Sequence, residues 1–202
     1  MSYNVALKCQ CGKLTGSLKN VSSSRGTHLI CYCDDCQKFA IALNREDTVL
    51  DDLGGTEIFQ SNPANLSFET GQDHLCCLRL TPKGLMRWYA GCCNTPIANT
   101  LPTPKVPFVG VIHTIFDFED EREKKKVLGK ISARIQSRFA RGKPPKNAHT
   151  RAPLRVILKA VFCLGLAWFR KENGVSPFFD GEGKPVVTPR VLELGERLAV
   201  PT

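Results

Sequence analysis

Ten cysteines in a chain of 202 residues are the side chains best suited to chemistry. Three of them fall close together in the run Cys31-Tyr-Cys33-Asp-Asp-Cys36. Thiolates at this spacing can reach one metal ion at a small entropic cost, and zinc accepts sulfur ligands at about 2.3 Å. Three protein ligands leave a fourth tetrahedral position free for water or substrate, as in catalytic zinc sites. We therefore predict an open zinc site at Cys31, Cys33 and Cys36, which would be its catalytic residues.

A second group of thiols is spread more widely along the chain. The pair Cys9-Gln-Cys11 cannot complete a tetrahedron alone, so we expect its partners in the late pair Cys92-Cys93. Adjacent residues of an extended chain point to opposite sides, so Cys92 and Cys93 can share a metal only on a tight turn. Two alternatives stay open: Cys92 is the fourth ligand, or the site lacks one.

The remaining cysteines are expected to be structural. Cys76 and Cys77 lie in the apolar run 75–80, where a strand would turn one thiol to the core and the other to the opposite face. The functional alternative is that one of them supplies the missing ligand. Cys163 lies in an apolar stretch expected to be a helix, and we place it in the core.

Three motifs together resemble the glutathione-dependent formaldehyde-activating enzyme family, which also includes centromere protein V. They are the opening Cys-x-Cys-Gly, the central Cys-x-Cys-x-x-Cys-Gln and the late Cys-Asn-Thr-Pro, and the resemblance covers residues 5–116. It implies a structural zinc at Cys9, Cys11 and Cys93. It also implies a second, catalytic zinc at the central cluster, close to a glutathione site. Where the family has its first late cysteine, this chain has Ala90.

The composition favours a folded chain in a reducing compartment. With 42% apolar residues it can bury a core, and its first residues do not resemble a secretory signal. We therefore predict a cytoplasmic location, where cysteines bind metals more often than they form disulfides. The longest apolar stretch, 160–169, is too short to span a bilayer, so we predict a buried helix and no transmembrane segment.

The predicted fold class is α+β, with a mainly-β zinc-binding sandwich of the Mss4-like type in residues 1–118 and a basic helical extension in 119–202. Short strand-like runs bounded by turn residues fill the first part; they are 27–32, 56–60, 66–70, 75–80, 85–90 and 108–116. Apolar residues every four positions predict a helix over 119–141, and Pro153 can open another that ends near residue 171. The tail from Gly174 is expected to be loop.

The net charge of +9 comes from the second half of the chain. Residues 122–159 hold 13 Lys and Arg against one acid, Glu123. The predicted basic helix in this segment could bind nucleic acid, an anionic membrane surface or an acidic partner. The alternative is a solvated surface whose apolar row packs on the core. No residue pattern indicates an oligomeric state.

Three functions are open to the central cluster. Three thiolates on zinc leave a charge of −1, so the metal would acidify water weakly and would favour capture of an external thiol. The resemblance implies a carbon–sulfur lyase acting on glutathione and formaldehyde, one or two zinc ions being its cofactor. Asp34 or Asp35 could move a proton there, or both could be solvated turn residues. Donors for an anionic thiol are available at Arg45, Arg79, Lys83 and Arg87.

The alternative to an enzyme is a non-catalytic zinc module whose basic surface binds an anionic partner. A thiol redox protein is a third option.

Overall fold

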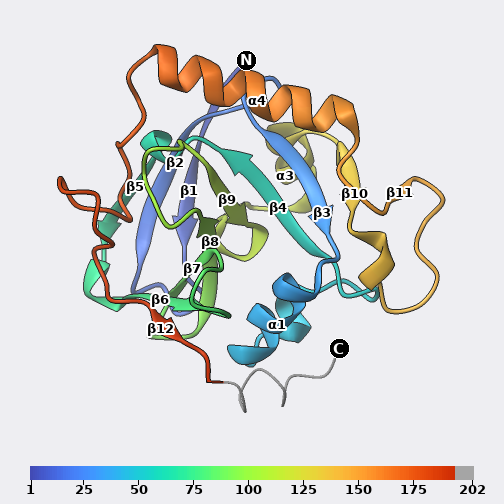
Figure 1. Cartoon of the computed structure of the whole chain (residues 1–202), viewed down its shortest axis with the longest axis horizontal. Helices are drawn as coiled ribbons and strands as arrows, with labels where there is room; N and C mark the ends of the chain where they lie inside the picture. Colours follow the sequence, from blue (N-terminus) through green and yellow to red (C-terminus); the bar gives the residue numbers. More distant parts are fainter. Residues whose placement is uncertain (194–202) are drawn as a thin grey trace.

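A computed structural model describes residues 1–193 as two β-sheets with a few helices around them (Figure 1). The smaller sheet is antiparallel and has the order β1 (Tyr3–Lys8), β2 (Thr15–Val21), β5 (Leu66–Thr70). The larger sheet has the order β11-β10-β3-β4-β9-β8-β7-β6-β12. Its strands are β3 (Thr27–Cys31), β4 (Thr56–Ser61), β6 (Leu75–Arg79), β7 (Met86–Ala90), β8 (Thr95–Thr100), β9 (Val109–Ile112), β10 (Ala133–Ile135), β11 (Ala148–His149) and β12 (Arg190–Val191).

The two sheets share one hydrophobic core. Leu7 and Leu18 of the small sheet belong to the same buried cluster as Trp88, Ile97 and Val111 of the large one. Strands β3, β8 and β9 are buried at every residue, whereas β1 alternates between buried and exposed positions. The mainly-β prediction is confirmed, and the observed strands match the predicted runs closely at β4 and β5.

In residues 1–193, four α-helices flank the sheets. They are α1 (Asp34–Ala42), α2 (Glu46–Val49), α3 (Glu121–Leu128) and α4 (Leu154–Phe169). Single 3-10 turns join other elements; they are η1 (Pro63–Asn65), η2 (Gln72–His74), η3 (His113–Ile115) and η4 (Ser137–Phe139). Helix α1 follows β3 directly and packs Phe39 and Ala40 against Leu78 and Ile112 of the large sheet. This connection places the run 31–36 at one end of β3.

The predicted helix over 119–141 is wrong beyond residue 128. Gly129 ends α3 with φ +75° and ψ −172°, a conformation that side chains with a Cβ avoid. The chain then becomes extended, and β10 pairs in parallel with β3, so that Ile135 lies opposite Cys31. Hydrogen bonds to this strand replace those that a continued helix would have made. Apolar residues spaced four apart therefore lie in a helix, a strand and a 3-10 turn, and not in one continuous helix.

Helix α4 forms where it was predicted, but the expectation that it is buried is wrong. Only Val156 and Ala167 are buried, and Cys163 is half-buried beside a cavity rather than in the core. The helix is apolar on more than one side, so packing one side on the sheets leaves another exposed. Among residues 1–193, no helix has both the length and the apolar character that a bilayer span needs.

The tail from Gly174 to residue 193 is mostly turns and loop, as predicted, and it contributes to the core. Phe178 is fully buried, with its ring 4.8 Å from that of Trp88. The predicted loop over 194–202 lies outside the described residues. Strands β10, β11 and β12 all extend the large sheet; the division of the chain at residue 118 stays a prediction.

Candidate metal centres

Four sulfur atoms converge between the β1–β2 turn and the β7–β8 turn. The Sγ atoms of Cys9, Cys11, Cys92 and Cys93 all lie within 4.8 Å of one another. Cys92 Sγ is 3.3 Å from Cys11 Sγ and 3.8 Å from Cys9 Sγ. A zinc ion with four sulfur ligands at about 2.3 Å holds them about 3.8 Å apart. The four thiols therefore fit a closed tetrahedral site, in which Cys92 supplies the fourth sulfur.

A tight turn lets two adjacent cysteines face one point. Residues 91–94 form the turn between β7 and β8, where the Cys93 N–H donates to the Ala90 carbonyl at 3.2 Å. Asn94 adopts φ +56°, a left-handed conformation that asparagine tolerates better than most residues. The chain is therefore not extended here, and the opposite orientation expected of neighbouring strand residues does not apply.

Hydrogen bonds around this first cluster favour the thiolate form of Cys93, whereas burial raises the pKa of Cys9 and of Cys92. The Leu14 N–H donates to Cys9 Sγ at 3.3 Å, and the Thr95 hydroxyl lies 3.1 Å from Cys93 Sγ. Burial raises the pKa of Cys93, but the Thr95 hydroxyl and the N–H groups of Cys11 and Thr95 outweigh it and lower that pKa to about 6. Donors already aimed at sulfur are typical of sites that bind a metal through thiolates.

The second cluster lies where β3 passes into α1. The Sγ atoms of Cys31, Cys33 and Cys36 lie within 4.8 Å of one another, so the predicted open site is brought together. Cys31 is the last residue of β3, Cys33 caps α1, and Cys36 lies in its first turn with its N–H bonded to the Cys33 carbonyl at 3.0 Å. Cys31 and Cys36 are buried and Cys33 is half-buried. No fourth His, Cys, Asp or Glu within the described residues joins these three.

Negative charge in this second cluster is concentrated on Cys36. The thiols of Cys31 and Cys33 donate hydrogen bonds to its sulfur and lower the pKa of Cys36 well below the ordinary value, and Arg87 lowers it further. Hydrogen bonds with Cys33 and Cys36, together with burial, raise the pKa of Cys31. A metal ion that displaced the thiol protons would bind three sulfur atoms that already lie within 4.8 Å of one another.

Arg87, one of the four proposed donors, reaches the second cluster and interacts with Cys36. Its side chain is almost fully buried in β7, where Nη1 donates to Asn99 Oδ1 at 3.2 Å and Nη2 lies 3.4 Å from Asp35 Oδ2. Its guanidinium also stacks over Phe39, 5.5 Å from the ring centroid. The Nε atom has no hydrogen-bond partner within the described part of the chain. The sequence could not single out Arg87, because β7 and α1 are brought together only by the tertiary fold.

Asp34 and Asp35 have different surroundings in the first turn of α1. Asp34 pairs with Lys38 at 2.8 Å, an ordinary contact across one helical turn. Asp35 is 58% exposed and faces the buried Arg87 guanidinium. Of the two carboxylates, Asp35 is therefore the one positioned between solvent and the second cluster.

The second half of the chain forms part of the wall of this cluster. Ile135 of β10 packs beside Cys31 and Cys36, and its carbonyl accepts a hydrogen bond from the Tyr32 N–H at 3.0 Å. Gln37, buried in α1, donates to the Phe139 carbonyl at 2.9 Å and accepts from Arg141 at 2.8 Å. Gln37 thus holds residues 139–141 beside the second cluster by hydrogen bonds.

The cysteines of β6 and the buried His28 take structural roles. Cys77 is buried and Cys76 half-buried on β6, as the strand alternation predicted, and neither belongs to a cluster. His28 is buried, with Nε2 2.7 Å from Glu57 and Nδ1 2.9 Å from the Gly129 carbonyl. Lys124 also binds Glu57 at 2.8 Å, so this network joins β3, β4 and α3.

Fold and sites define a mainly-β protein with two cysteine clusters, one of four thiols and one of three, which could hold zinc or another metal. The chain belongs to DUF6151, a family of unknown function that matches residues 1–189. Among solved structures, it is similar to a Rhodobacter sphaeroides protein from a structural genomics project, with 14% identity and a TM-score of 0.43 over 62% of this chain and 96% of that chain. No curated protein is significantly similar to it.

Proposed function

We propose that the protein is a zinc-dependent carbon–sulfur lyase that acts on the adduct of formaldehyde with glutathione or a related small thiol. Cys9, Cys11, Cys92 and Cys93 would hold a structural zinc ion. The three-sulfur cluster would hold a second one, at which an external thiol is stabilised as its thiolate. The observation that carries this proposal is the contrast between four converging sulfurs in the first cluster and three in the second.

The residues around the second cluster suit a reaction between a thiol and an aldehyde. In the forming direction, the thiol sulfur bonds to the carbonyl carbon and the thiol proton ends on the carbonyl oxygen. Asp35 is exposed enough to exchange that proton with water, and Arg87 offers positive charge to an anionic oxygen or sulfur. The reverse reaction uses the same groups in the opposite order.

The finer fold assignment belongs to the same proposal. An Mss4-like sandwich would explain how widely spaced Cys-x-Cys and Cys-Cys segments meet at one end of the two sheets. The motif resemblance to the glutathione-dependent formaldehyde-activating enzymes supports this arrangement and the substrate class. A reducing cytoplasm, where the thiols stay unpaired, is the compartment that this chemistry requires.

Metal analysis of two variants tests the two-site part of the proposal. We expect Cys36→Ser to lose one zinc ion and keep its fold, whereas Cys11→Ser loses the other zinc and unfolds more readily. Zinc content by plasma mass spectrometry and thermal unfolding by circular dichroism give both readouts. A single zinc ion lost together with the fold in either variant would contradict separate sites.

Exchange spectroscopy tests the activity directly. Proton NMR of glutathione and formaldehyde should show faster interconversion with the native protein, and no acceleration with Cys36→Ser. Cys76→Ser is the matched control, because it alters a thiol outside both clusters. If the native protein binds two zinc ions but gives no acceleration, the non-catalytic zinc module becomes the better description.

A further inference from the structure

The side of α4 that faces solvent is apolar along the whole helix, which crosses the molecule at the top of Figure 1. At about 3.6 residues per turn, the most exposed residues fall within about 120° of the helix circumference and so share one side; they are Leu154, Leu158, Val161, Phe162, Trp168 and Phe169. Phe162 is 69% exposed, Trp168 67% and Phe169 86%. Single exposed apolar residues are ordinary, but a continuous row of this kind marks an interaction surface.

Hydrogen bonds from two basic side chains of α4 to backbone carbonyls hold the helix in this orientation. Lys159 Nζ donates to the carbonyl of Ser23 at 2.6 Å and to that of Gly26 at 2.5 Å. Arg155 Nη2 donates to the Ser132 carbonyl at 3.2 Å. The basic side chains therefore reach toward the protein while the apolar row points outward, which is the reverse of a helix that packs its apolar side on a core.

The segment that carries α4 is strongly cationic. Residues 124–171 contain 14 Lys and Arg and no Asp or Glu. Arg151 lies just before the helix, and Arg170 and Lys171 directly follow Phe169. An apolar row with basic residues at both ends matches the chemistry of an anionic bilayer, whose acyl region takes up the apolar side chains and whose headgroups take up the charge.

We propose that α4 docks the protein on an anionic lipid bilayer, lying in the plane of the membrane surface. Sixteen residues of helix are about 24 Å long, less than the roughly 30 Å of a bilayer core, so the helix lies on the membrane. Nucleic acid would meet the basic residues but leave the apolar row in water. A second copy of the chain would bring two cationic segments together, which like-charge repulsion opposes.

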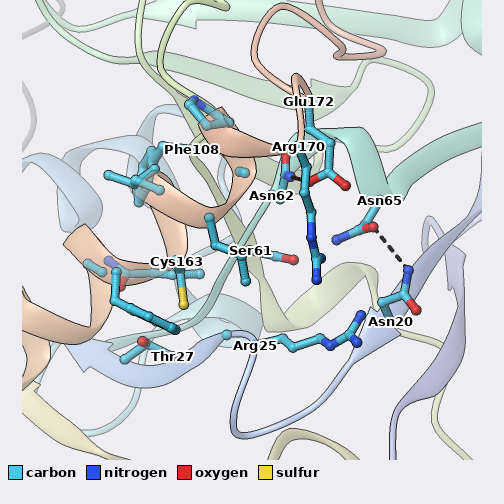
Figure 2. A pocket seen from close by; sticks show the side chains of 18 of the residues that line it. Asn20, Arg25, Thr27, Ser61, Asn62, Asn65, Phe108, Cys163, Arg170 and Glu172 are labelled. Carbon is cyan, nitrogen blue, oxygen red and sulfur yellow. Dashed lines mark hydrogen bonds between the residues drawn. The ribbon is translucent and has the colours of Figure 1, made fainter.

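A cavity beneath α4 adds a place for a lipid headgroup. It measures about 100 Å³, and Phe162 links it to the apolar row of the helix. Figure 2 shows the Arg25 and Arg170 side chains extending toward the same space within it. Neither guanidinium has an ion-pair partner among residues 1–193, and the nearby Glu172 is bound by Asn62 at 2.6 Å. Two guanidinium groups in one cavity suit a phosphate.

Intrinsic fluorescence tests the docking, because the chain contains two tryptophans in opposite environments. Trp88 is fully buried, so a change on adding vesicles reports Trp168. We expect a blue shift and co-sedimentation with vesicles of phosphatidylcholine and phosphatidylglycerol, weakened by salt and absent with phosphatidylcholine alone. The Trp168→Phe variant should lose the shift and still co-sediment.

Charged substitutions on α4 distinguish membrane docking from self-association of the chain. Leu158→Glu and Phe162→Glu should lower vesicle binding about tenfold or more, which corresponds to about 1.4 kcal/mol or more. Val186→Glu, at an exposed apolar position outside α4, should bind like the native protein. The proposal fails if the native protein ignores anionic vesicles, binds neutral ones equally, or keeps its binding in both α4 variants. It also fails if sedimentation velocity shows a dimer without lipid that the α4 variants convert to monomer.

Discussion

At the scale of single residues, the first cluster depends on whether Cys92 and Cys93 can face the same point. Neighbouring residues of a strand point to opposite sides, so adjacency alone predicts that the two thiols diverge. The turn over residues 91–94 turns both toward one point, and the small Gly91 and the turn-forming Asn94 beside the pair were the sequence features that could have indicated it. The seven cysteines of the two predicted sites are thus the seven that the structure groups.

Replacing Cys92 should therefore open the first site. We expect Cys92→Ser to lose the structural zinc or bind it far more weakly, and to unfold at a lower temperature, because binding of a structural zinc contributes directly to folding. Zinc content and the unfolding midpoint give the result. Cys76→Ser is the control; equal effects in both variants would show that Cys92 is not a ligand.

Glu57 provides a pH-dependent test in the His28–Glu57–Lys124 network. Burial would raise the pKa of Glu57, but hydrogen bonds from His28 and Lys124, with the positive charges of Lys124 and His113, lower it from 4.5 to about 2. A carboxyl with a depressed pKa stabilises the fold above its unfolded pKa, and this stabilisation is lost as the pH falls from 4.5 through about 2.

Glu57→Gln should therefore lower the free energy of unfolding by about 1–3 kcal/mol at pH 7, since it removes hydrogen bonds to a charged group. The difference from the native protein should shrink toward zero as the pH approaches 2. Chemical unfolding of both proteins across this range measures it. A difference that stays constant with pH would contradict the depressed pKa.

At the scale of elements, strands bounded by turn residues could be predicted, whereas the segment 119–141 could not. Its apolar residues every four positions fit a helix, but Gly129 and the open edge of β3 favour a strand after residue 128. Local periodicity carries no information about a distant edge that offers hydrogen bonds. For a similar reason the outward orientation of α4 could not be predicted, because hydrophobicity alone does not determine which side of a helix packs on the sheets.

Two glycines in or next to helices should respond oppositely to alanine. Gly129 has φ +75°, and a Cβ there would lie 3.0 Å from Ser23 Cβ, so Gly129→Ala should destabilise the protein by about 1–3 kcal/mol. At Gly165, inside α4, an added Cβ would meet no atom within 4 Å beyond its chain neighbours and the adjoining helix backbone, so Gly165→Ala should stabilise by about 0.5–1 kcal/mol. Thermal unfolding distinguishes the signs. A Gly129→Ala variant as stable as the native protein would argue against the positive φ at Gly129, and destabilisation by Gly165→Ala would argue against free space at that position.

At the scale of the whole molecule, the later part of the chain completes both the core and the second cluster. Phe178 packs on Trp88, and β10 covers Cys31 from the side. No sequence pattern indicated these contacts, since the tail contains a single aromatic pair, Phe178-Phe179, among Pro and Gly. The three-sulfur cluster therefore depends on residues more than one hundred positions away.

Phe178→Ala tests this contribution of the tail. Emptying a fully buried aromatic position should lower the free energy of unfolding by about 3–5 kcal/mol. Phe169→Ala, at an 86% exposed position on α4, should change it little. Urea unfolding of the two variants compares them. Equal free energies of unfolding for the two variants would mean that Phe178 does not contribute to the hydrophobic core.

X-ray absorption at the zinc edge distinguishes a chain with one closed and one open cysteine site from a chain with two closed sites. For the native protein with both sites loaded, we predict an average of about 3.5 sulfur ligands per zinc, rising toward about 4 when glutathione is added. Four sulfurs per zinc before glutathione, or an average that glutathione leaves unchanged, would contradict an open thiol-binding site at Cys31, Cys33 and Cys36.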